Sequence, residues 1–244
     1  MIKYRTHIDE GVRYRVQGVV FMNGVTQDVT VKSFDDGRVN YGYLFIKRLF
    51  DIVVSMIGII FMIPVAIIVR ISYYFAGDFA SIFYKQKRIG KNGKYIYIYK
   101  FRSMVTNADE ILKELLKNPK YKKEWDENQK FEHDPRITKL GNILRKTSLD
   151  ELPQFINVIK GDMSMIGPRP LVEGELDSHN GNHELYESVR PGITGWWACN
   201  GRSAIDYEDR LNLEYYYVKH ASLSLDIKCV FLTIKVVLFR DGAK

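Results

Sequence analysis

Cysteine is scarce in this chain of 244 residues, since Cys199 and Cys229 are the only two and neither has a second cysteine at a metal-site spacing. A disulfide framework and a cysteine-based zinc site are therefore excluded, and both thiols are typical of small buried hydrophobic residues. His179 and His183 are spaced like metal ligands, but Asn180-Gly181-Asn182 between them favours a loop. Zinc sites usually include further Cys or His ligands, so we do not expect one here.

A secretory signal is also missing, because residues 1–10 are polar and contain no apolar core with a small-residue cleavage site. We therefore expect synthesis to end in the cytoplasm. Disorder is excluded as well: hydrophobic residues make up 46% of the chain and aromatic residues 13%, which is enough apolar surface for folding. The length predicts one main globular domain with room for a small appendage.

Acidic residues are fewer than basic ones, 29 against 36, which leaves a formal net charge of +7. This excess attracts anions, which include nucleic acid, phosphate-bearing substrates and the anionic leaflet of a membrane. Charge alone does not choose among these partners.

The run Ile52–Val69 contains no charged residue and has the length of a helix that enters hydrocarbon. Apolar residues surround all of its faces, which favours lipid over the core of a soluble protein. Pro64 removes a backbone hydrogen bond and bends a helix, so a helix that returns after Pro64 keeps both basic flanks on the cytoplasmic side. The pattern therefore favours a re-entrant membrane helix over a full crossing. The flanking cations are Lys47, Arg48, Arg70, Lys85, Lys87 and Arg88.

The segment before the apolar run has a different composition. Residues 14–34 alternate and are rich in valine around Asn23-Gly24, which predicts a small β-hairpin with a two-residue turn. Asp35-Asp36-Gly37 then separates this hairpin from the apolar run. We expect a β-rich appendage over residues 1–42, the membrane helix with its basic flanks over 43–78, and a cytoplasmic domain over 79–244.

The segment after the apolar run begins with mixed secondary structure. Asn92-Gly93 beside the alternating Tyr95–Tyr99 predicts a second hairpin. Residues Ala108–Lys117 place four apolar side chains on one helical stripe, and Pro119 follows the end of that stripe. Strands and helices therefore both occur in the cytoplasmic domain.

The rest of the domain is predominantly helical by pattern. Ser148 and Glu151 have the spacing of a capping box, which predicts a helix near residues 152–159. Asp226–Phe239 is amphipathic, so it either covers a core or lies on a membrane. Together the patterns predict an α+β fold: a mostly helical domain with a re-entrant membrane helix, interfacial amphipathic helices and a small N-terminal β-hairpin.

Two adjacent carboxylate pairs are candidates for chemistry. Asp109-Glu110 stands at the start of a predicted helix, where unpaired N–H groups and the helix dipole favour negative charge and can also receive a phosphate. This makes Asp109 a candidate nucleophile, although acidic residues are common in first helical turns for stability alone. Asp150-Glu151 has the same stabilising explanation, and Glu151 has a second one in the capping box.

Basic residues gather around glycine and proline in the cytoplasmic domain. Arginines on turns are commonly only solvated, whereas several on rigid loops can form the planar, bidentate clamp that a diphosphate needs. The sequence leaves both interpretations open. The candidate cations are Arg88, Lys100, Arg102, Arg136, Arg145, Arg169, Arg190 and Arg202.

Several blocks stand in a recognisable order along the chain. They are KRLFD (47–51), YKFRSM (99–104), NADE (107–110), DPRITKLGNILRKTSLDELPQFINVIKGDMSMIGPRP (134–170) and RPGITG (190–195). With these blocks the chain resembles the bacterial sugar transferase family, also called polyprenyl-phosphate hexose-1-phosphate transferases or monotopic phosphoglycosyl transferases. The resemblance runs from Lys47 nearly to the C-terminus and implies that residues 79–244 form a catalytic domain with membrane-interface helices.

The resemblance implies transfer of a sugar 1-phosphate from a UDP-sugar to polyprenyl (undecaprenyl) phosphate, with release of UMP. It implies a ping-pong course in which the aspartate of an Asp-Glu pair is the nucleophile; here that is Asp109, with Glu110 as its catalytic partner. Mg²⁺ is the implied cofactor, held at Asp109. Asp150 and Glu151 join the candidate cations in binding the substrates.

The resemblance also implies a location and a set of partners. The catalytic domain is expected on the cytoplasmic face of a bacterial inner membrane, where it contacts membrane lipid and no nucleic acid. The reaction is expected to initiate an exopolysaccharide, a capsule or an O-antigen. A homodimer is compatible with this arrangement.

Two positions depart from the family pattern. Ile63 precedes Pro64 where some members carry serine, so the backbone hydrogen bond of a serine is missing at the expected bend. After Gly195 the chain continues with Trp196-Trp197-Ala198-Cys199 in place of a Leu-Ala-Gln-Val-like stretch. Contacts to the sugar or to the carrier are expected to differ there.

Two other classes of function stay open from the residues alone. A non-enzymatic module that binds a membrane surface or nucleic acid explains the charge and the amphipathic C-terminal segment, but it leaves the ordered motifs unexplained. A two-carboxylate glycosidase places two acids across a sugar ring and needs no lipid-facing helix. Release of UMP from a UDP-sugar that depends on polyprenyl phosphate distinguishes the transferase from both.

Overall fold

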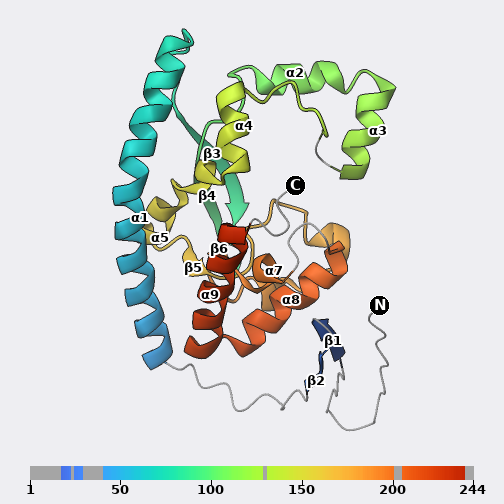
Figure 1. Ribbon diagram of the computed structural model, residues 1–244. Coiled ribbons are helices and arrows are strands. Elements are labelled where there is room, and N and C mark those ends of the chain that lie inside the picture. The colour runs from blue at the N-terminus through green and yellow to red at the C-terminus, as the bar shows by residue number, and fades with distance from the viewer. Residues whose placement is uncertain (1–17, 23–24, 30–40, 129–130, 201–204, 240–244) are drawn as a thin grey trace. The chain divides into compact units, whose positions relative to one another are not determined.

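The computed structural model describes residues 18–22, 25–29, 41–128, 131–200 and 205–239 (Figure 1). The chain divides into two units, Met1–Tyr41 and Gly42–Lys244. In the first unit, β1 (Gly18–Met22) pairs antiparallel with β2 (Val25–Val29), and Met22 stands opposite Val25. The expected turn residues Asn23-Gly24 lie outside the described residues.

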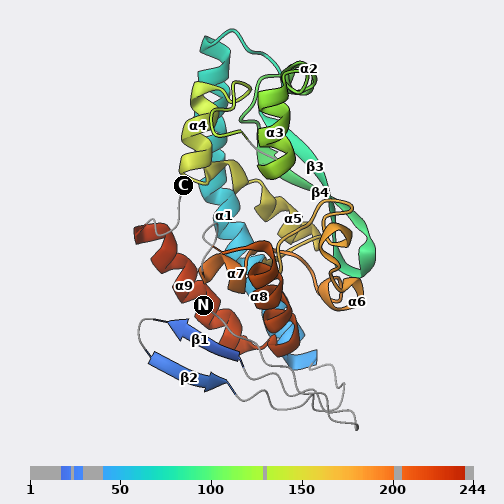
Figure 2. The ribbon, with the colours of Figure 1, turned by 90° about the vertical axis from the view of Figure 1, so that its right-hand side faces the viewer.

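The second unit is mostly helical with small sheets, as the sequence predicts (Figures 1 and 2). Strand β3 (Phe83–Ile89) pairs antiparallel with β4 (Tyr95–Phe101), and β5 (Ser164–Ile166) pairs parallel with β6 (Gly192–Thr194). The α-helices are α1 (Tyr41–Phe75), α2 (Ala108–Leu115), α3 (Pro119–Asn128), α4 (Lys139–Lys146), α5 (Gln154–Lys160), α6 (His183–Tyr186), α7 (Trp196–Cys199), α8 (Tyr207–His220) and α9 (Leu223–Phe239). Short 3-10 helices are η1 (Lys91–Gly93), η2 (Leu149–Glu151) and η3 (Asp177–His179).

Helix α1 is one continuous helix of 35 residues that runs through Pro64, so the expected bend and return at this proline are not confirmed. One face of the helix is buried, and its opposite face exposes large apolar side chains such as Phe61 and Ile68. The apolar run therefore has hydrophobic residues on every side because one side packs on protein and the other faces outward. The buried face consists of Asp51, Ser55, Gly58, Met62, Val69 and Tyr73.

The rest of the second unit contacts α1 from its first turns to its last. Near the start of the helix, Arg48 donates hydrogen bonds to the carbonyls of Val158 and Ile159 at the end of α5, at 2.7 and 2.9 Å. Near its end, the Tyr73 hydroxyl donates to the carbonyl of Arg102, at 2.7 Å. Figure 1 shows α1 running along the side of the unit. Both ends of a helix about 50 Å long are thus held on the same domain.

The β3–β4 hairpin presents two basic residues on one face. The predicted turn at Asn92-Gly93 is confirmed, because both residues have positive φ, 57° and 69°. In the register, Arg88 stands opposite Ile96 and Lys100 stands opposite Tyr84. Partners across a ladder share a face, and residues two or four apart on one strand do so as well. Arg88 and Lys100 therefore project from the same face of the hairpin, the one that buries Ile96.

The predicted capping box at Ser148 is wrong. Ser148 has a left-handed backbone, with φ of 56°, and its side chain makes no capping hydrogen bond. The short helix η2 follows instead, and α5 begins only after Pro153, whose fixed φ suits the start of a helix. Glu151 is consequently free of the capping role that the sequence pattern assigned to it.

Helix α9 has two apolar sides. Cys229 is fully buried within the core that α9 shares with α8, where Tyr217 is also buried. The opposite side of α9 exposes large apolar residues at helical spacing, and Figure 2 shows this helix at one side of the domain. One side of α9 therefore covers a core, and its other side is an exposed apolar surface, called here the bare side. The bare side carries Leu223, Ile227, Phe231 and Ile234.

Candidate active site

The acidic pair Asp150-Glu151 lies on η2, between α4 and α5. Ser148 directly precedes η2 in the left-handed conformation, and a non-glycine residue held there stores backbone strain of the kind that clusters at functional sites. Glu151 forms an ion pair with Lys100, whose Nζ lies 2.8 Å from Oε1. The pair therefore joins η2 to the end of β4.

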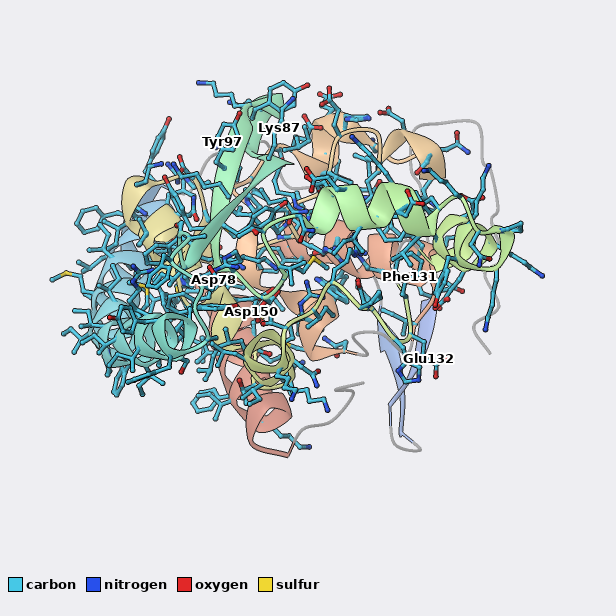
Figure 3. The ribbon with its side chains drawn as sticks, turned by 90° about the horizontal axis from the view of Figure 1, so that it is seen from above. Asp78, Lys87, Tyr97, Phe131, Glu132 and Asp150 are labelled. Atoms are coloured by element: carbon cyan, nitrogen blue, oxygen red, sulfur yellow. The ribbon has the colours of Figure 1, made fainter. Side chains whose placement is uncertain are left out.

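Asp150 is half-buried beside this ion pair, and Figure 3 shows it on the other side of the hairpin from Lys87 and Tyr97. Within the described part of the chain, no side chain forms a hydrogen bond with the Asp150 carboxyl. Burial raises the pKa of Asp150 and the charge of Glu151 adds to this, whereas Lys100 opposes it. Asp150 is thus a carboxylate without a side-chain hydrogen bond among the described residues. It lies next to a cation, and its pKa is higher than that of an exposed aspartate.

Arg145 brings a second cation to Asp150, and its charge also acts on the pKa of that carboxyl. Its Nε donates to the Ser103 hydroxyl at 2.8 Å, which links α4 to the segment after β4. Gly141 makes this approach possible, because a Cβ added there would lie 1.9 Å from the Ser103 carbonyl oxygen. Thr138 caps α4 by accepting a hydrogen bond from the Gly141 N–H at 2.8 Å.

A second group of arginines continues the polar surface from β3. Arg88 lies 3.9 Å from a carboxylate oxygen of Glu175, and Arg210 on α8 lies 3.3 Å from its other oxygen. Burial lowers the pKa of Arg88, and the charge of Arg169 lowers it further, while Glu175 and Glu151 act in the opposite direction. The charge on Arg88 is therefore influenced by Arg169 and Glu175, and least by Glu151 of the acidic pair.

Two of the predicted substrate-binding cations form ion pairs with nearby carboxylates. Arg102 pairs with Asp78 at 2.8 Å and lies over the ring of Tyr73 at 4.3 Å. Arg136 forms a bidentate pair with Asp134, at 2.9 and 2.7 Å. Burial raises the pKa of Asp134, but the hydrogen bonds from Arg136 outweigh burial and leave this pKa lowered. Both guanidinium groups thus already have carboxylate partners.

The predicted nucleophile Asp109 lies on α2, a helix that carries none of the clustered cations. Asp109 and Glu110 are exposed in the first turn of α2, and among the described residues no ion pair or hydrogen bond reaches either carboxylate. Arg190 donates to the carbonyl of Gly161 at 2.8 Å, and Arg202 lies outside the described residues. The structure therefore brings the cations Lys100 and Arg145 to Asp150-Glu151, and no such cation to Asp109-Glu110 among the described residues.

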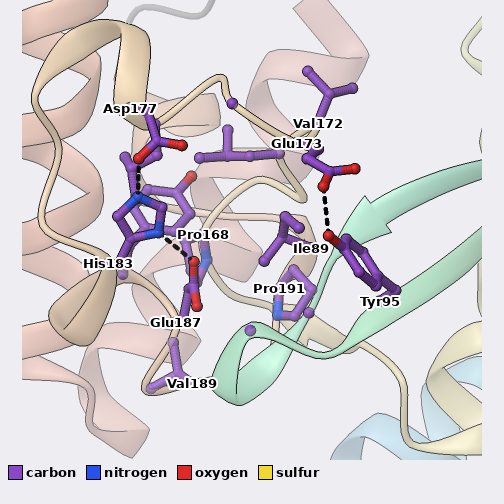
Figure 4. Close-up of a pocket in the computed structure, with 16 residues that line it drawn as sticks. Ile89, Tyr95, Pro168, Val172, Glu173, Asp177, His183, Glu187, Val189 and Pro191 are labelled. Atoms are coloured by element: carbon purple, nitrogen blue, oxygen red, sulfur yellow. Dashed lines mark hydrogen bonds and ion pairs between the residues drawn. The ribbon is translucent and has the colours of Figure 1, made fainter.

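A cavity of about 280 Å³ lies at the turn end of the β3–β4 hairpin (Figure 4). On its wall, His183 lies between the carboxylates of Glu187 and Asp177, each at 2.7 Å, and these hydrogen bonds raise the pKa of His183. Tyr95 also lines the cavity and stands five residues before Lys100, about 17 Å along the strand. The cavity is therefore separate from the acidic pair, and its charged groups already pair with one another.

The two histidines that the sequence spaces like metal ligands have other partners. His179 stacks on Tyr207 with ring centroids 3.5 Å apart, whereas His183 contacts the carboxylates of Asp177 and Glu187. Over the residues that the structure describes, no three His, Cys, Asp or Glu side chains come together as a metal cluster.

A family model described as bacterial sugar transferase matches residues 42–240, which include every element of this site. The chain belongs to the bacterial sugar transferase family. This membership confirms the resemblance that the ordered sequence blocks carried, and it covers the whole second unit except its last residues.

Individual relatives of this sugar transferase extend the comparison. It is 46% identical over 200 residues to an undecaprenyl-phosphate galactose phosphotransferase of Salmonella typhimurium, covering 82% of this chain and 42% of the relative. It is 42% identical over 198 residues to the exopolysaccharide production protein ExoY of Sinorhizobium fredii, covering 81% of this chain and 87% of the relative. The galactosyl transferase CpsE of Streptococcus agalactiae is 42% identical over 211 residues, covering 84% and 44%. The chain thus spans less than half the length of two of these relatives.

Three polar residues near the arginines of the second group were not singled out by the sequence patterns: Glu175, Arg210 and Glu214. Their signal in the sequence is weak, because charged residues on a helix are usually solvated. Arg210 and Glu214 are nevertheless four apart, which places them on one face of α8. Glu214 is completely buried, which no periodicity in this segment indicates.

Proposed function

We propose that this chain transfers a sugar 1-phosphate from a UDP-sugar to polyprenyl phosphate and so initiates a surface polysaccharide. The observation that carries the proposal is the half-buried Asp150, which has no side-chain hydrogen-bond partner among the described residues and lies beside the Lys100–Glu151 pair. The names of the relatives support the carrier and the transferred group, since one is an undecaprenyl-phosphate galactose phosphotransferase. The test is UMP release from UDP-sugars by membrane fractions, which should require added polyprenyl phosphate for continued turnover.

Asp150 takes the place of Asp109 as the proposed nucleophile, because the cations surround Asp150. A carboxylate oxygen of Asp150 attacks the phosphorus that bears the sugar, and the bond from this phosphorus to the bridging oxygen breaks. That oxygen and its electron pair leave with UMP, and a phosphosugar remains on the aspartate. An oxygen of polyprenyl phosphate then attacks the same phosphorus, and the Asp150 carboxylate is released unchanged.

The cations around the pair act on the charge that develops at phosphorus. Lys100 and Arg145 are the groups whose charges act most directly on Asp150, and they can neutralise the phosphoryl oxygens in both half-reactions. Glu151 holds Lys100 at 2.8 Å, so it keeps that ammonium group beside the nucleophile. Arg88 projects from the same hairpin face as Lys100 and adds positive charge for the phosphates of the donor.

The donor set at the acidic pair fits the proposed Mg²⁺. Magnesium is commonly bound by one or two carboxylates together with substrate phosphates, so a dedicated protein cage is not required. Asp150 and Glu151 supply hard oxygen donors of this kind, and only one oxygen of Glu151 is used by Lys100. When bound, the metal ion would neutralise negative charge on the phosphates.

The contacts of α1 support a position on one side of the membrane. Arg48 near its start and Tyr73 near its end both bind the catalytic domain, so a perpendicular crossing would pull polar parts of the domain into hydrocarbon. The exposed apolar face of α1 and the bare side of α9 can enter the membrane while the domain stays outside it. The proposed location is the cytoplasmic face of a bacterial inner membrane, where a lipid-linked phosphate is accessible.

This location predicts that both ends of α1 stay inaccessible from the periplasm. We expect single cysteines at Phe45 and Ala76, both exposed, to resist a membrane-impermeant thiol reagent in intact cells and to react after permeabilisation. The background chain would carry alanine at Cys199 and Cys229. Labelling of either position in intact cells contradicts the one-sided arrangement.

The N-terminal unit is predicted to be dispensable for the chemistry. Removing residues 1–40 should leave turnover within about threefold of the full chain in detergent, because the family match begins at residue 42 and every site residue follows it. Circular dichroism of both proteins controls for folding. A folded but inactive truncation would show that the N-terminal unit contributes to the site.

A further inference from the structure

The backbone of Arg169 is held by two side chains from distant elements. Pro168 and Pro170 have no N–H, so the N–H of Arg169 is the only backbone donor in this tripeptide. It donates to Glu214 Oε1 on α8 at 2.9 Å, and the carbonyl of Arg169 accepts a hydrogen bond from the Tyr186 hydroxyl, also at 2.9 Å. The loop is therefore fixed around Arg169, whose charge acts on Arg88, a residue on the same hairpin face as Lys100.

Glu214 belongs to a buried group whose polar atoms are incompletely paired. Four buried side-chain nitrogen or oxygen atoms in the described residues have no hydrogen-bond partner, and three of them are Glu214 Oε2, Arg210 Nε and Arg88 Nε. A purely structural network normally satisfies such atoms. Instead, three arginines surround two carboxylates here, so the group carries excess positive charge close to the site.

We propose that Glu214 is a positioning residue of the transfer reaction, which in its neutral form fixes the Arg169 backbone and leaves the arginine charge available to a substrate phosphate. The inference rests on the proposed function, since the phosphate belongs to that reaction. An ionised Glu214 would cancel one of the guanidinium charges. A neutral carboxyl still accepts the hydrogen bond from the Arg169 N–H and leaves the positive charge of the guanidinium groups undiminished.

The surroundings of Glu214 agree with a neutral carboxyl at physiological pH. Burial raises the pKa of Glu214 to about 8, although the hydrogen bond from Arg169 and the charges of Arg210 and Arg169 act to lower it. Because the pKa is higher in the folded than in the unfolded chain, the stabilising contribution of this group is complete below the ordinary pKa of 4.5 and is lost progressively as the pH rises from there to about 8. The titratable and charged groups that face the cluster are Arg88, Arg169, Glu175, Tyr186, Tyr207 and Arg210.

The first test compares pH profiles of kcat and KM for wild type, Glu214→Gln and the control Glu208→Gln, an exposed glutamate on the same helix. Wild type should lose activity with an apparent pKa of about 8. Glu214→Gln should stay within about threefold of wild type at neutral pH and lack this alkaline decline, because glutamine mimics the neutral carboxyl. The control should keep the wild-type profile. An unchanged alkaline decline in Glu214→Gln overturns the proposal, as does inactivity of this variant in a folded state.

The second test follows the Arg169 amide by hydrogen exchange and does not depend on turnover. We expect equal protection in wild type, Glu214→Gln and Glu208→Gln, and at least about tenfold faster exchange in Glu214→Leu, which lacks the acceptor. Unchanged protection in Glu214→Leu rejects the positioning role even if transfer is observed. Conversely, a wild-type protein that is inactive with every UDP-sugar rejects the proposed function, whatever the amide shows.

Discussion

Replacing Asp150 with asparagine should lower turnover by about 10³-fold or more, as expected when a covalent nucleophile is lost. Asparagine keeps the size of the side chain but removes the charged oxygen that attacks phosphorus. Stability should fall little, because no side chain in the described residues is bonded to this carboxyl. The measurement is the steady-state rate of UMP release with a UDP-sugar and polyprenyl phosphate.

The matched control is Asp109→Asn, which removes the other candidate carboxylate. We expect its turnover within about threefold of wild type, since Asp109 is exposed on a helix that carries none of the clustered cations. Without lipid acceptor, wild type and Asp109→Asn should both gain the mass of a phosphosugar, whereas Asp150→Asn should not. The reverse pattern would restore Asp109 as the nucleophile. No adduct in any protein, with kinetics that require both substrates together, would indicate direct transfer to the lipid phosphate.

Lys100→Met should reduce kcat/KM by about 10²-fold, the scale on which a preorganised electrostatic contact contributes to catalysis. The methionine retains much of the side-chain length but cannot neutralise a phosphoryl oxygen or hold Glu151. Lys100 also lowers the pKa of Asp150. Its loss should therefore raise that pKa further and move the acidic limb of the pH–rate profile to higher pH, because the reaction needs the ionised carboxylate.

Lys94→Met is the control for this substitution, because Lys94 is exposed at the turn end of the same hairpin. It should leave both kcat/KM and the acidic limb unchanged. Lys100→Arg should recover part of the activity, since it restores the charge with a different geometry. The rate of Lys100→Met could fall while the acidic limb of its pH–rate profile stays in place. This result would show that Lys100 does not act on the ionisation of Asp150, and it would contradict the proposed arrangement of the site.

Much of the fold follows from local patterns that the structure retains. The positive φ values at Asn92 and Gly93 appear where an Asn-Gly turn was predicted, and α2 begins at Ala108 as its apolar stripe indicates. The apolar run around Pro64 forms a helix as expected, but this helix is longer and unbroken. A proline tends to bend a helix because it removes a backbone hydrogen bond. The packing of one face of α1 on the domain also affects the path of the helix, and the position of the proline in the sequence does not reveal that packing.

The site was harder to predict, because two Asp-Glu pairs look alike in the sequence. Helix-start position and the family resemblance favoured Asp109, and the apparent capping box assigned Glu151 a structural role. The left-handed backbone at Ser148 removes that role, and the Lys100 ion pair gives Glu151 another. Neither feature is visible from residue spacing, since both depend on how η2 meets the end of β4.

The sequence by itself determined the family resemblance, the long apolar helix and the set of cations from which a phosphate site can be built, because ordered motifs and apolar length are local properties. Only the tertiary structure decided which groups those cations contact. Arg102 and Arg136 form ion pairs with the nearby carboxylates of Asp78 and Asp134, whereas the charges of Lys100 and Arg145 act on Asp150. The physical reason is that the ionisation and reactivity of a carboxyl depend on burial and on charges brought from distant segments, which only the folded chain supplies.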